Sequence, residues 1–516
     1  MRVYEGILIA VTIAALIGSL FIFKKSRWML RTSAGLAALL FAAHALVEGL
    51  RWPMLPAYAT VALLLLLELR QELFHSKITK QRKARNDSQA AEPTFLMHRS
   101  RTKRATTKRT TVRRVLSGAA ILVYAAVSIA LPVLFPIFSF DTPKGPYGIG
   151  TVSYAWTDEA REETFAAGKG SPRQLRVQVW YPADPNAQGT ASAYVPDAQV
   201  YLQAFRDILG LPELLFSSLK DVRTHAIQAA PLSTEESAYP VLIFSHGLHG
   251  YESQNTFQIE RLVSEGYIVV GINHTYSSLA SVFPDGQVAL FDGQGKQGFE
   301  ELQFDFMDNL NKIWVKDVQF VLDRLERLNA NDADRRFTGH LDMQRIGMFG
   351  HSFGGATTVQ MLLNDPRIQA GINMDGVLFG EDRIPAEGVG KPFMMMSADS
   401  TLAGAEAMSD EQIAAMGTTR SEAEEYYKQV YARYAPVTAD GNTWVTLDDT
   451  LHLSFSDLFL MSPLLEWTQG VDARGTQRLV NALTLDFFDH YLKGQPLNML
   501  NQPAGQYEGY TLQRES

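Results

Sequence analysis

Gly350-His351-Ser352-Phe353-Gly354-Gly355 is a Gly-x-Ser-x-Gly run that lies between two segments of different pattern. Residues 345–349 before it are predicted to form a short buried strand, and residues 356–363 after it a helix. A serine on such a sharp strand-to-helix turn adopts a strained backbone conformation and projects its hydroxyl above the end of the sheet. Glycine is needed on both sides, because larger side chains would collide with the turn. We therefore predict that Ser352 is a nucleophile and not part of an ordinary glycine-rich turn.

Strand and helix patterns alternate around this run. Continuous β-branched runs at 239–244 and 267–272 are typical of strands that are buried on both faces. Residues 251–265 and 306–328 have the spacing of amphipathic helices. Further strands are predicted at 149–156, 175–181, 370–374, 392–397 and 443–447, and a helix at 476–492 closes the chain. This succession predicts an α/β domain with a mostly parallel central sheet and helices on both of its faces.

A serine hydroxyl is a weak nucleophile, so it needs a base nearby. In folds with this turn the order along the chain is serine, then an acid, then histidine. Of the eleven histidines, two follow Ser352. His490 lies within the helical pattern at 476–492, whereas His452 lies in a loop directly after the strand at 443–447. We therefore predict that His452 is the general base.

The acid that orients this base has two candidates. Asp375 directly follows the strand at 370–374, and Asp399 follows the strand at 392–397. Both lie at carboxyl ends of predicted parallel strands, where ligands and catalytic groups gather in such sheets. Position alone slightly favours Asp399, so the residue pattern leaves the choice between the two open.

Charge is strongly segregated along the chain. Residues 1–114 carry 20 Lys and Arg against 6 Asp and Glu, whereas the remainder carries 27 against 49. Such a split indicates two regions in different surroundings. The chain contains no cysteine, which excludes disulfides, thiolate catalysis and cysteine-based metal sites.

The basic region contains four apolar stretches, at about 5–23, 32–50, 55–69 and 115–138. They are predicted to be transmembrane helices, because most of them approach or exceed the length that crosses a bilayer core of about 30 Å. Residues 1–138 are thus predicted to form an all-α membrane region, and residues 139–516 the catalytic domain.

The orientation of the helices in the membrane is predicted from the Lys and Arg residues of the short loops that connect them. The loop predicted at 71–114 carries 13 of them. It is expected to be cytoplasmic and to bind anionic lipid headgroups, in preference to nucleic acid. With four crossings the catalytic domain is expected to lie on the extracellular or periplasmic side of the cell membrane.

Four segments, in order, resemble the platelet-activating-factor acetylhydrolase family (plasma and bacterial lipase-like members). They are Phe244-Ser-His-Gly-Leu248, Gly350-His-Ser-Phe-Gly-Gly-Ala-Thr357, Gly371-Ile-Asn-Met-Asp375-Gly-Val-Leu-Phe379 and Leu451-His452-Leu-Ser-Phe-Ser-Asp457. The resemblance implies the α/β-hydrolase fold and runs from about residue 239 to the last helix. The membrane region lies outside it.

The resemblance also implies the roles of the site residues. Ser352 would be the nucleophile, Asp375 the acid and His452 the base, and the amides of Leu248 and Phe353 would hold the oxyanion. It implies short or oxidised acyl chains on phospholipid-like esters as substrates. Residues 403–434 are longer than expected for the family and form either a lid over an acyl pocket or a structural insertion.

Three further histidines lie close to these segments. His246 and His249 are expected to order the oxyanion loop and not to bind a metal, and His351 is expected to be a packing residue that points away from Ser352. No metal or organic cofactor is predicted.

We thus expect a membrane-anchored serine esterase or lipase that acts on a lipid or small ester through an acyl-enzyme. Two alternatives stay open. The same residues could serve a peptidase or an acyltransferase with a different acceptor, or the chain could be a non-enzymatic membrane sensor with a hydrolase-like ectodomain.

Overall fold

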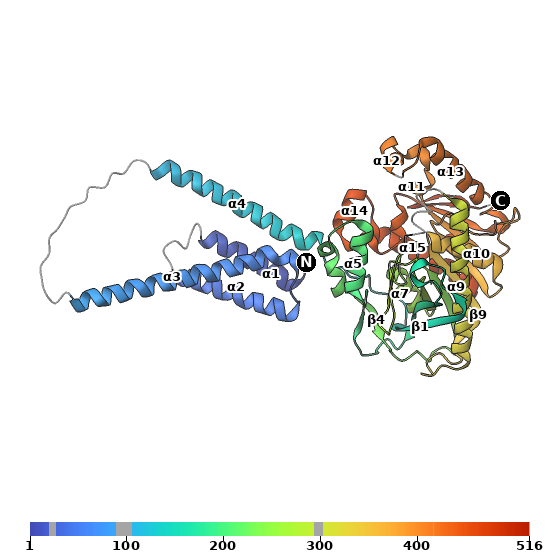
Figure 1. Ribbon diagram of the computed structural model, residues 1–516, viewed down its shortest axis with the longest axis horizontal. Helices are drawn as coiled ribbons and strands as arrows, with labels where there is room; N and C mark the ends of the chain where they lie inside the picture. Colours follow the sequence, from blue (N-terminus) through green and yellow to red (C-terminus); the bar gives the residue numbers. More distant parts are fainter. Residues whose placement is uncertain (20–26, 89–105, 294–302, 416, 515–516) are drawn as a thin grey trace. The chain divides into compact units, whose positions relative to one another are not determined.

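The computed structural model describes residues 1–19, 27–88, 106–293, 303–415 and 417–514. The chain divides into two compact units, Met1–Pro136 and Ile137–Ser516 (Figure 1). Each unit has its own buried hydrophobic side chains, so each is described separately.

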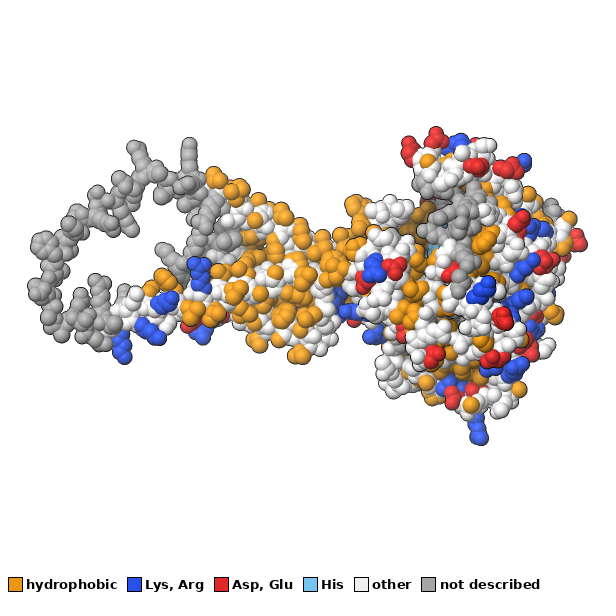
Figure 2. Space-filling view, viewed as in Figure 1, with side chains coloured by type: hydrophobic (Ala, Val, Ile, Leu, Met, Phe, Trp, Pro, Cys, Tyr) orange, Lys and Arg blue, Asp and Glu red, His pale blue; other side chains and the backbone are white. Residues whose placement is uncertain are grey.

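The first unit is helical. Its helices are α1 (Val3–Ile17), α2 (Arg27–Val47), η3 (Trp52–Met54), α3 (Leu55–Ser88) and α4 (Thr106–Leu134). Small and branched side chains such as Leu8, Ala34 and Val61 pack between them. Hydrophobic side chains also crowd the outer surface of this unit, whereas charged side chains are spread over the surface of the other unit (Figure 2).

An apolar outer surface is what a lipid environment favours. Among the described residues, three helices are long and apolar enough to cross a membrane: Trp28–Val47, Trp52–Gln81 and Val115–Leu134. Val3–Ile17 is a shorter apolar helix. The stretch predicted at 5–23 extends into residues 20–23, which lie outside the described residues.

The loop predicted at 71–114 is partly helical, which corrects that prediction. α3 continues to Ser88 and α4 begins at Thr106. The reason is that the end of an apolar run need not be the end of a helix. Residues 71–85 are rich in Gln, Glu, Lys and Arg, which are good helix formers, so the helix persists beyond the apolar stretch.

Charged side chains join the four helices at one end of the unit. Arg51 donates to the Glu5 carboxylate at 2.8 Å and also to the carbonyl oxygen of Phe135. Arg2 forms ion pairs with Glu5 at 3.0 Å and with Glu48 at 3.8 Å. These contacts link the start of α1, the end of α2, the start of α3 and the end of α4, so α1 and α3 begin, and α2 and α4 end, at the same end of the unit.

The second unit is built on one sheet. Among the described residues the strand order is β13-β14-β12-β11-β10-β9-β5-β6-β2-β1-β4-β3. The run from β12 to β6 is parallel, and it is extended by an antiparallel neighbour on each side, β14 next to β12 and β2 next to β6. The strands of the parallel run are β5 (Tyr239–Ser245), β6 (Ile268–Asn273), β9 (Leu341–His351), β10 (Ile368–Met374), β11 (Phe393–Ala398) and β12 (Thr443–Leu447). The others are β1 (Gly148–Glu162), β2 (Pro172–Ala183), β3 (Ala191–Ala193), β4 (Arg223–Gln228), β13 (Gly505–Tyr507) and β14 (Tyr510–Gln513). A separate hairpin consists of β7 (Ala280–Val282) and β8 (Val288–Leu290).

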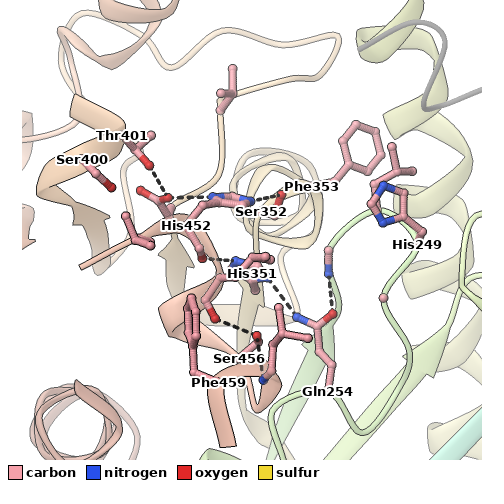
Figure 3. A pocket seen from close by; sticks show the side chains of 18 of the residues that line it. His249, Gln254, His351, Ser352, Phe353, Ser400, Thr401, His452, Ser456 and Phe459 are labelled. Carbon is pink, nitrogen blue, oxygen red and sulfur yellow. Dashed lines mark hydrogen bonds and ion pairs between the residues drawn. The ribbon is translucent and has the colours of Figure 1, made fainter. Parts of the chain in front are cut away.

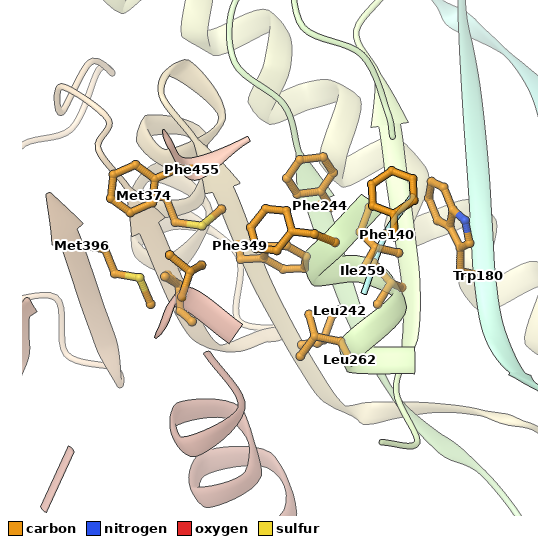
Figure 4. Close-up of a cluster of buried hydrophobic side chains, with 14 of the residues drawn as sticks. Phe140, Trp180, Leu242, Phe244, Ile259, Leu262, Phe349, Met374, Met396 and Phe455 are labelled. Atoms are coloured by element: carbon orange, nitrogen blue, oxygen red, sulfur yellow. The ribbon is translucent and has the colours of Figure 1, made fainter. Parts of the chain in front are cut away.

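Helices cover both faces of this sheet. α9 (Phe304–Ala330) and α10 (Phe353–Asn364) pack on one face, and α7 (Thr256–Ser264) and α15 (Ala473–Lys493) on the other. Successive residues of a strand point to opposite faces, so β5 sends Leu242 and Phe244 toward α7 and Ile243 toward α9. Figure 4 shows Leu242 and Phe244 beside Ile259 of α7. Continuous hydrophobic runs are therefore buried on both sides.

The remaining helices lie in the connections. They are α5 (Ala198–Leu209), α6 (Glu213–Phe216), α11 (Asp399–Leu402), α12 (Asp410–Ala415), α13 (Arg420–Tyr434) and α14 (Pro463–Gln469). Single 3-10 turns include η8 (His452–Phe455) and η9 (Leu458–Met461).

Two sequence expectations about element ends were wrong. The helix predicted at 251–265 begins at Thr256, where Asp457 accepts hydrogen bonds from the amides of Thr256 (2.8 Å) and Phe257 (3.3 Å). A cap supplied from some 200 residues away leaves no local signal. The chain also does not close on α15, because β13 and β14 follow it and extend the sheet beyond β12.

Candidate active site

Ser352 occupies a strained turn between β9 and α10. Its φ is 55° and its ψ −122°, a backbone conformation that side chains rarely adopt. A Cβ atom on Gly350 would lie 2.2 Å from the carbonyl oxygen of Gly354, and one on Gly354 would lie 2.1 Å from that of Ser245. Both neighbouring positions therefore require glycine for the steric reason expected from the sequence.

Three predicted site residues meet in one hydrogen-bonded chain. The Ser352 hydroxyl lies 2.9 Å from Nε2 of His452, and Nδ1 of His452 lies 2.7 Å from a carboxylate oxygen of Asp375 (Figure 3). The Asp375 side chain is buried, whereas 42% of the His452 side chain is exposed. Asp375 accepts a hydrogen bond from Nδ1–H of His452. The Nε2 of a neutral His452 then carries no proton and can take one from Ser352.

The two candidate acids have different surroundings. Asp375 also accepts hydrogen bonds from the amide of Ala398 at 2.9 Å and the hydroxyl of Thr401 at 2.7 Å. Asp399 instead accepts from the amides of Asp449 (2.9 Å) and Thr450 (3.0 Å), so it supports the backbone just before His452. In the structure Asp375 contacts His452 itself, whereas Asp399 contacts the backbone of the loop that carries His452.

The loop at 246–250 lies directly beside Ser352, since a Cβ on Gly247 would be 3.2 Å from the Cβ of Ser352. The carbonyl of Gly247 accepts hydrogen bonds from Nδ1 of His246 (2.6 Å) and from the amide of Gly250 (2.8 Å). That carbonyl shares a peptide plane with the amide of Leu248, which therefore points the opposite way. Burial lowers the pKa of His246 well below its usual value, so its ring stays neutral.

Phe353 is the first residue of α10, and the first amides of a helix have no partner within it. The amides of Leu248 and Phe353 thus belong to two different elements that flank the serine. Both residues also line the cavity described below.

A second serine, histidine and aspartate are hydrogen-bonded in the same succession, from hydroxyl to imidazole to carboxylate, although their order along the chain differs. The hydroxyl of Ser245 is 2.9 Å from Nε2 of His274, whose Nδ1 is 3.0 Å from Asp317. All three side chains are fully buried, and Arg173 pairs with Asp317 at 2.6 Å. Burial lowers the pKa of His274, and Arg173 holds that of Asp317 low against its own burial. We assign this array to the support of β5 and β6, because a substrate cannot reach a fully buried serine.

His351 has a polar role that the sequence did not indicate. The centre of its ring lies 4.7 Å from that of the His452 ring, with the two planes tilted by 37°, and its Nε2 donates to the carbonyl oxygen of His452 at 2.8 Å. Its Nδ1 lies 2.9 Å from the side-chain amide of Gln254. The expectation that His351 is a packing residue is therefore incomplete, because the loop that carries His452 lies against its ring and accepts a hydrogen bond from it.

A cavity of about 880 Å³ opens at Ser352 and His452. Its walls are mainly apolar and aromatic. α5 and the region from η9 to α14 supply one group of residues: Phe205, Ile208, Leu458, Phe459, Met461 and Leu465. A second group comes from the start of α10, from the loop that follows β10, and from α13: Phe353, Val377, Phe379, Tyr426, Tyr427, Val430 and Tyr434. The site therefore combines a nucleophile with a large hydrophobic space.

α13 belongs to the segment 403–434 and is fixed to the core of the unit. Arg433 pairs with both oxygens of Asp308 in α9, at 2.8 and 3.0 Å, and its guanidinium lies 4.1 Å from the centre of the Phe304 ring. The hydroxyl of Tyr431 donates to the carbonyl of Leu402 at 2.9 Å. In this structure α13 is a wall of the cavity.

His246 and His249 lie in the same loop, but within the described part of the chain no group of three His, Cys, Asp or Glu side chains is arranged to hold a metal ion. His246 uses both ring nitrogens in hydrogen bonds, to the Gly247 carbonyl and from the His274 amide at 3.2 Å.

Several known proteins are similar to this chain in sequence or in fold. A family model described as "Platelet-activating factor acetylhydrolase, isoform II" matches residues 138–498. The platelet-activating factor acetylhydrolase of Cavia porcellus is 29% identical over 266 residues, which are 48% of this chain and 59% of that protein. A probable 1-alkyl-2-acetylglycerophosphocholine esterase of Arthroderma benhamiae is 26% identical over 271 residues, 50% of this chain and 64% of that protein. The chain thus spans less than two thirds of the length of these curated relatives.

Among solved structures, a ferulic acid esterase from Streptomyces cinnamoneus superposes with a TM-score of 0.55 and 24% identity. The superposition covers 73% of this chain and 100% of that chain. This likeness concerns the fold, and with the sheet order it confirms the predicted α/β-hydrolase architecture.

Proposed function

The chain belongs to the platelet-activating factor acetylhydrolase isoform II family, and from this premise we propose that it is a membrane-anchored serine esterase that hydrolyses acyl esters of phospholipid-like molecules. The observation that carries the proposal is the chain from Ser352 through His452 to Asp375 at the mouth of an apolar cavity. The curated relatives are named as enzymes that act on such esters.

The proposed reaction begins when His452 takes the proton of Ser352 as the oxygen attacks the ester carbonyl. The carbonyl oxygen becomes an oxyanion that accepts hydrogen bonds from the amides of Leu248 and Phe353. Collapse of the tetrahedral intermediate breaks the ester bond, and the leaving alcohol receives the proton from His452. Water then attacks the acyl-enzyme, with His452 again as the base, and releases the acid.

Asp375 has two tasks in this scheme. It holds the ring of His452 with Nδ1 protonated, and its charge stabilises the imidazolium that forms during attack. The hydrogen bonds from the Ala398 amide and the Thr401 hydroxyl keep the carboxylate in place. The backbone at Asp375 is in the left-handed region, with φ at 56°.

The cavity supports a lipid-like substrate. Apolar walls on both sides of the serine offer burial to an acyl chain and to the apolar part of a leaving group, at roughly 25 cal/mol per Å² of buried apolar surface. Phospholipid-like esters with short-chain or oxidised acyl groups fit the family and this lining. The volume leaves room for groups larger than acetyl.

The helical unit supports anchoring in a membrane, with the catalytic unit on the extracellular or periplasmic side. Among its described residues three helices are long and apolar enough to cross, and the polar contacts of Arg51 and Glu5 join the start of α1 to the end of α4. That arrangement suits four crossings, in which the N-terminus and the catalytic unit share one side. The Lys and Arg residues between α3 and α4 favour the cytoplasm for the opposite end.

The direct test is Ser352→Ala in the full chain, in detergent or in membranes. Hydrolysis of a short-chain p-nitrophenyl ester and labelling by a fluorophosphonate should both be lost, while the yield of folded protein stays normal. Retained turnover would contradict the assignment of Ser352.

A further inference from the structure

We propose that Gln254 and His351 are positioning residues that tie the loop at 246–250 to the loop that carries His452. Through them the oxyanion donor and the base would keep fixed positions on either side of Ser352. The inference rests on the proposed function and names two residues that neither the motifs nor the family match assigns.

The hydrogen bonds leave one consistent proton arrangement. The carbonyl oxygen of His452 can only accept, so Nε2 of His351, at 2.8 Å, carries the proton. Nδ1 of the neutral ring is then an acceptor, and the NH₂ group of Gln254, at 2.9 Å, must donate to it. The oxygen of the same side chain accepts from the amide of Gly247 at 3.3 Å. Figure 3 shows this path from Gln254 through His351 to His452.

A neutral His351 is required for this arrangement. The ring is 2% exposed, and its burial, with the neighbouring His452, lowers its pKa to about 3. At neutral pH the ring therefore has one donor and one acceptor, which match the His452 carbonyl and the Gln254 amide.

Space for this link is built into the loop. A Cβ on Gly250 would lie 2.0 Å from the side-chain oxygen of Gln254, and one on Gly247 would lie 3.2 Å from Nδ1 of His351. The two glycines thus leave room for the side chains that form the link. The backbone of Gln254 adds a second tie, because its carbonyl accepts from the amide of Asp457 at 2.9 Å, five residues beyond His452.

The link has a mechanistic consequence because its two ends come from distant parts of the chain. Leu248 follows β5 and His452 follows β12, and the order of strands separates them by β9, β10 and β11. Neither loop holds its position relative to the other through the sheet alone. A displacement of about 1 Å at a reacting group is enough to cost on the order of 100-fold in rate.

The experiment compares Gln254→Met, His351→Leu and the double variant in the full chain, with Gln178→Met as the matched control. Gln178 of β2 is equally buried, lies away from the site, and donates a hydrogen bond of 3.0 Å to the hydroxyl of Thr151 in β1. The readouts are kcat and KM for p-nitrophenyl acetate, the rate of fluorophosphonate labelling, and Tm. If Gln254→Met fails to fold, Gln254→Glu replaces it, because it keeps the acceptor for Gly247 but cannot donate to His351.

We expect each single variant to lower kcat and the labelling rate by about 10-fold or more, with KM within about twofold. The double variant should fall no further than the worse single variant, because both act through one link. Gln178→Met should lower Tm and leave kcat unchanged. Normal kcat in the single variants, a rise in KM alone, or multiplied losses in the double variant would overturn the inference. A wild-type chain that is neither hydrolytic nor labelled would overturn the proposed function as well.

Discussion

His246 donates a hydrogen bond of 2.6 Å from its Nδ1 to the carbonyl oxygen of Gly247, and this contact sets the direction of the next amide in the chain. The Gly247 carbonyl and the Leu248 amide belong to one planar peptide unit, so fixing one fixes the other. The Nε2 atom of His246 is held in turn by the amide of His274 at 3.2 Å. A fully buried histidine therefore aims the amide that we propose as an oxyanion donor.

Replacement of His246 tests this relationship. His246→Leu should lower kcat for a p-nitrophenyl ester by about 100-fold, because removal of one oxyanion donor costs that much or more in rate. KM should change little, since the donor acts mainly on the transition state. His246→Asn is the matched variant, because its amide nitrogen stands close to the position of Nδ1, and it should retain more activity. A loss confined to KM would contradict the role.

Asp375→Asn and Asp399→Asn should differ sharply. An amide at 375 cannot stabilise the imidazolium of His452, so kcat should fall by about 10³- to 10⁴-fold. Asparagine at 399 weakens two hydrogen bonds to the amides of Asp449 and Thr450, so Tm should fall and kcat should fall by less than about tenfold. Steady-state kinetics and thermal unfolding of both variants decide the matter. If Asp399→Asn alone were crippling, the acid would be Asp399.

The fixed position of α13 predicts a selective effect on long acyl chains. Arg433→Met breaks the pair with Asp308 and should loosen the aromatic wall formed by Tyr426 and Tyr434. The ratio of kcat/KM for an eight-carbon ester to that for an acetate ester should fall severalfold. Lys428→Ala removes an exposed ion pair of the same helix and is the control. A rise in activity on long chains would instead identify α13 as a lid that restricts entry.

Buried neutral histidines predict acid sensitivity. Burial lowers the pKa of His351 to about 3, whereas a histidine of the unfolded chain titrates near 6.5. Between these values the unfolded chain binds a proton that the folded chain does not, so stability falls as the pH drops from about 6.5 toward about 3. The loss is about 1.4 kcal/mol for each pH unit from this one group.

The check is the free energy of unfolding between pH 7 and pH 5 for the full chain and for His351→Gln. The variant should show a shallower dependence on pH. His490→Gln, which removes a partly exposed histidine of α15, is the control. An unchanged slope in His351→Gln would mean that the ring is protonated in the folded state.

The absence of cysteine from the chain makes topology testable with single substitutions. Lys144→Cys lies in the catalytic unit and Lys77→Cys in α3 beyond its most apolar part, and both positions are exposed. A membrane-impermeant maleimide should label Lys144→Cys on intact cells, and Lys77→Cys after permeabilisation alone. The reverse pattern would place the catalytic unit in the cytoplasm.

Much of the catalytic unit could be predicted from local patterns. Each strand of the parallel run from β6 to β12 could be predicted within a few residues of its ends. Strands such as β5 and β6 are buried on both faces and are therefore continuous apolar runs, whereas β12 alternates buried and partly buried residues. His452 could be found because the order of serine, acid and histidine left two histidines to consider. β13 and β14 were missed, since each is short and is stabilised by pairing with β12.

The choice between Asp375 and Asp399 could not be made from the residue pattern. Both end parallel strands, so both reach the same edge of the sheet. What separates them is the direction of each carboxylate: one points to His452, and the other to the amides of Asp449 and Thr450. Side-chain direction depends on packing around the site, and here the resemblance to the family had to supply the answer.

The sequence by itself determined the turn at Ser352, because Gly350 is required by a contact with the carbonyl of Gly354, only four residues further along the chain. Tertiary structure alone decided which residues support His452, the partner of that serine. Gln254, His351 and His452 lie about 100 residues apart from one to the next, and their hydrogen bonds exist because the sheet brings three loops to one edge. Such contacts leave no pattern of spacing in the chain, since each partner is set by the packing of whole elements.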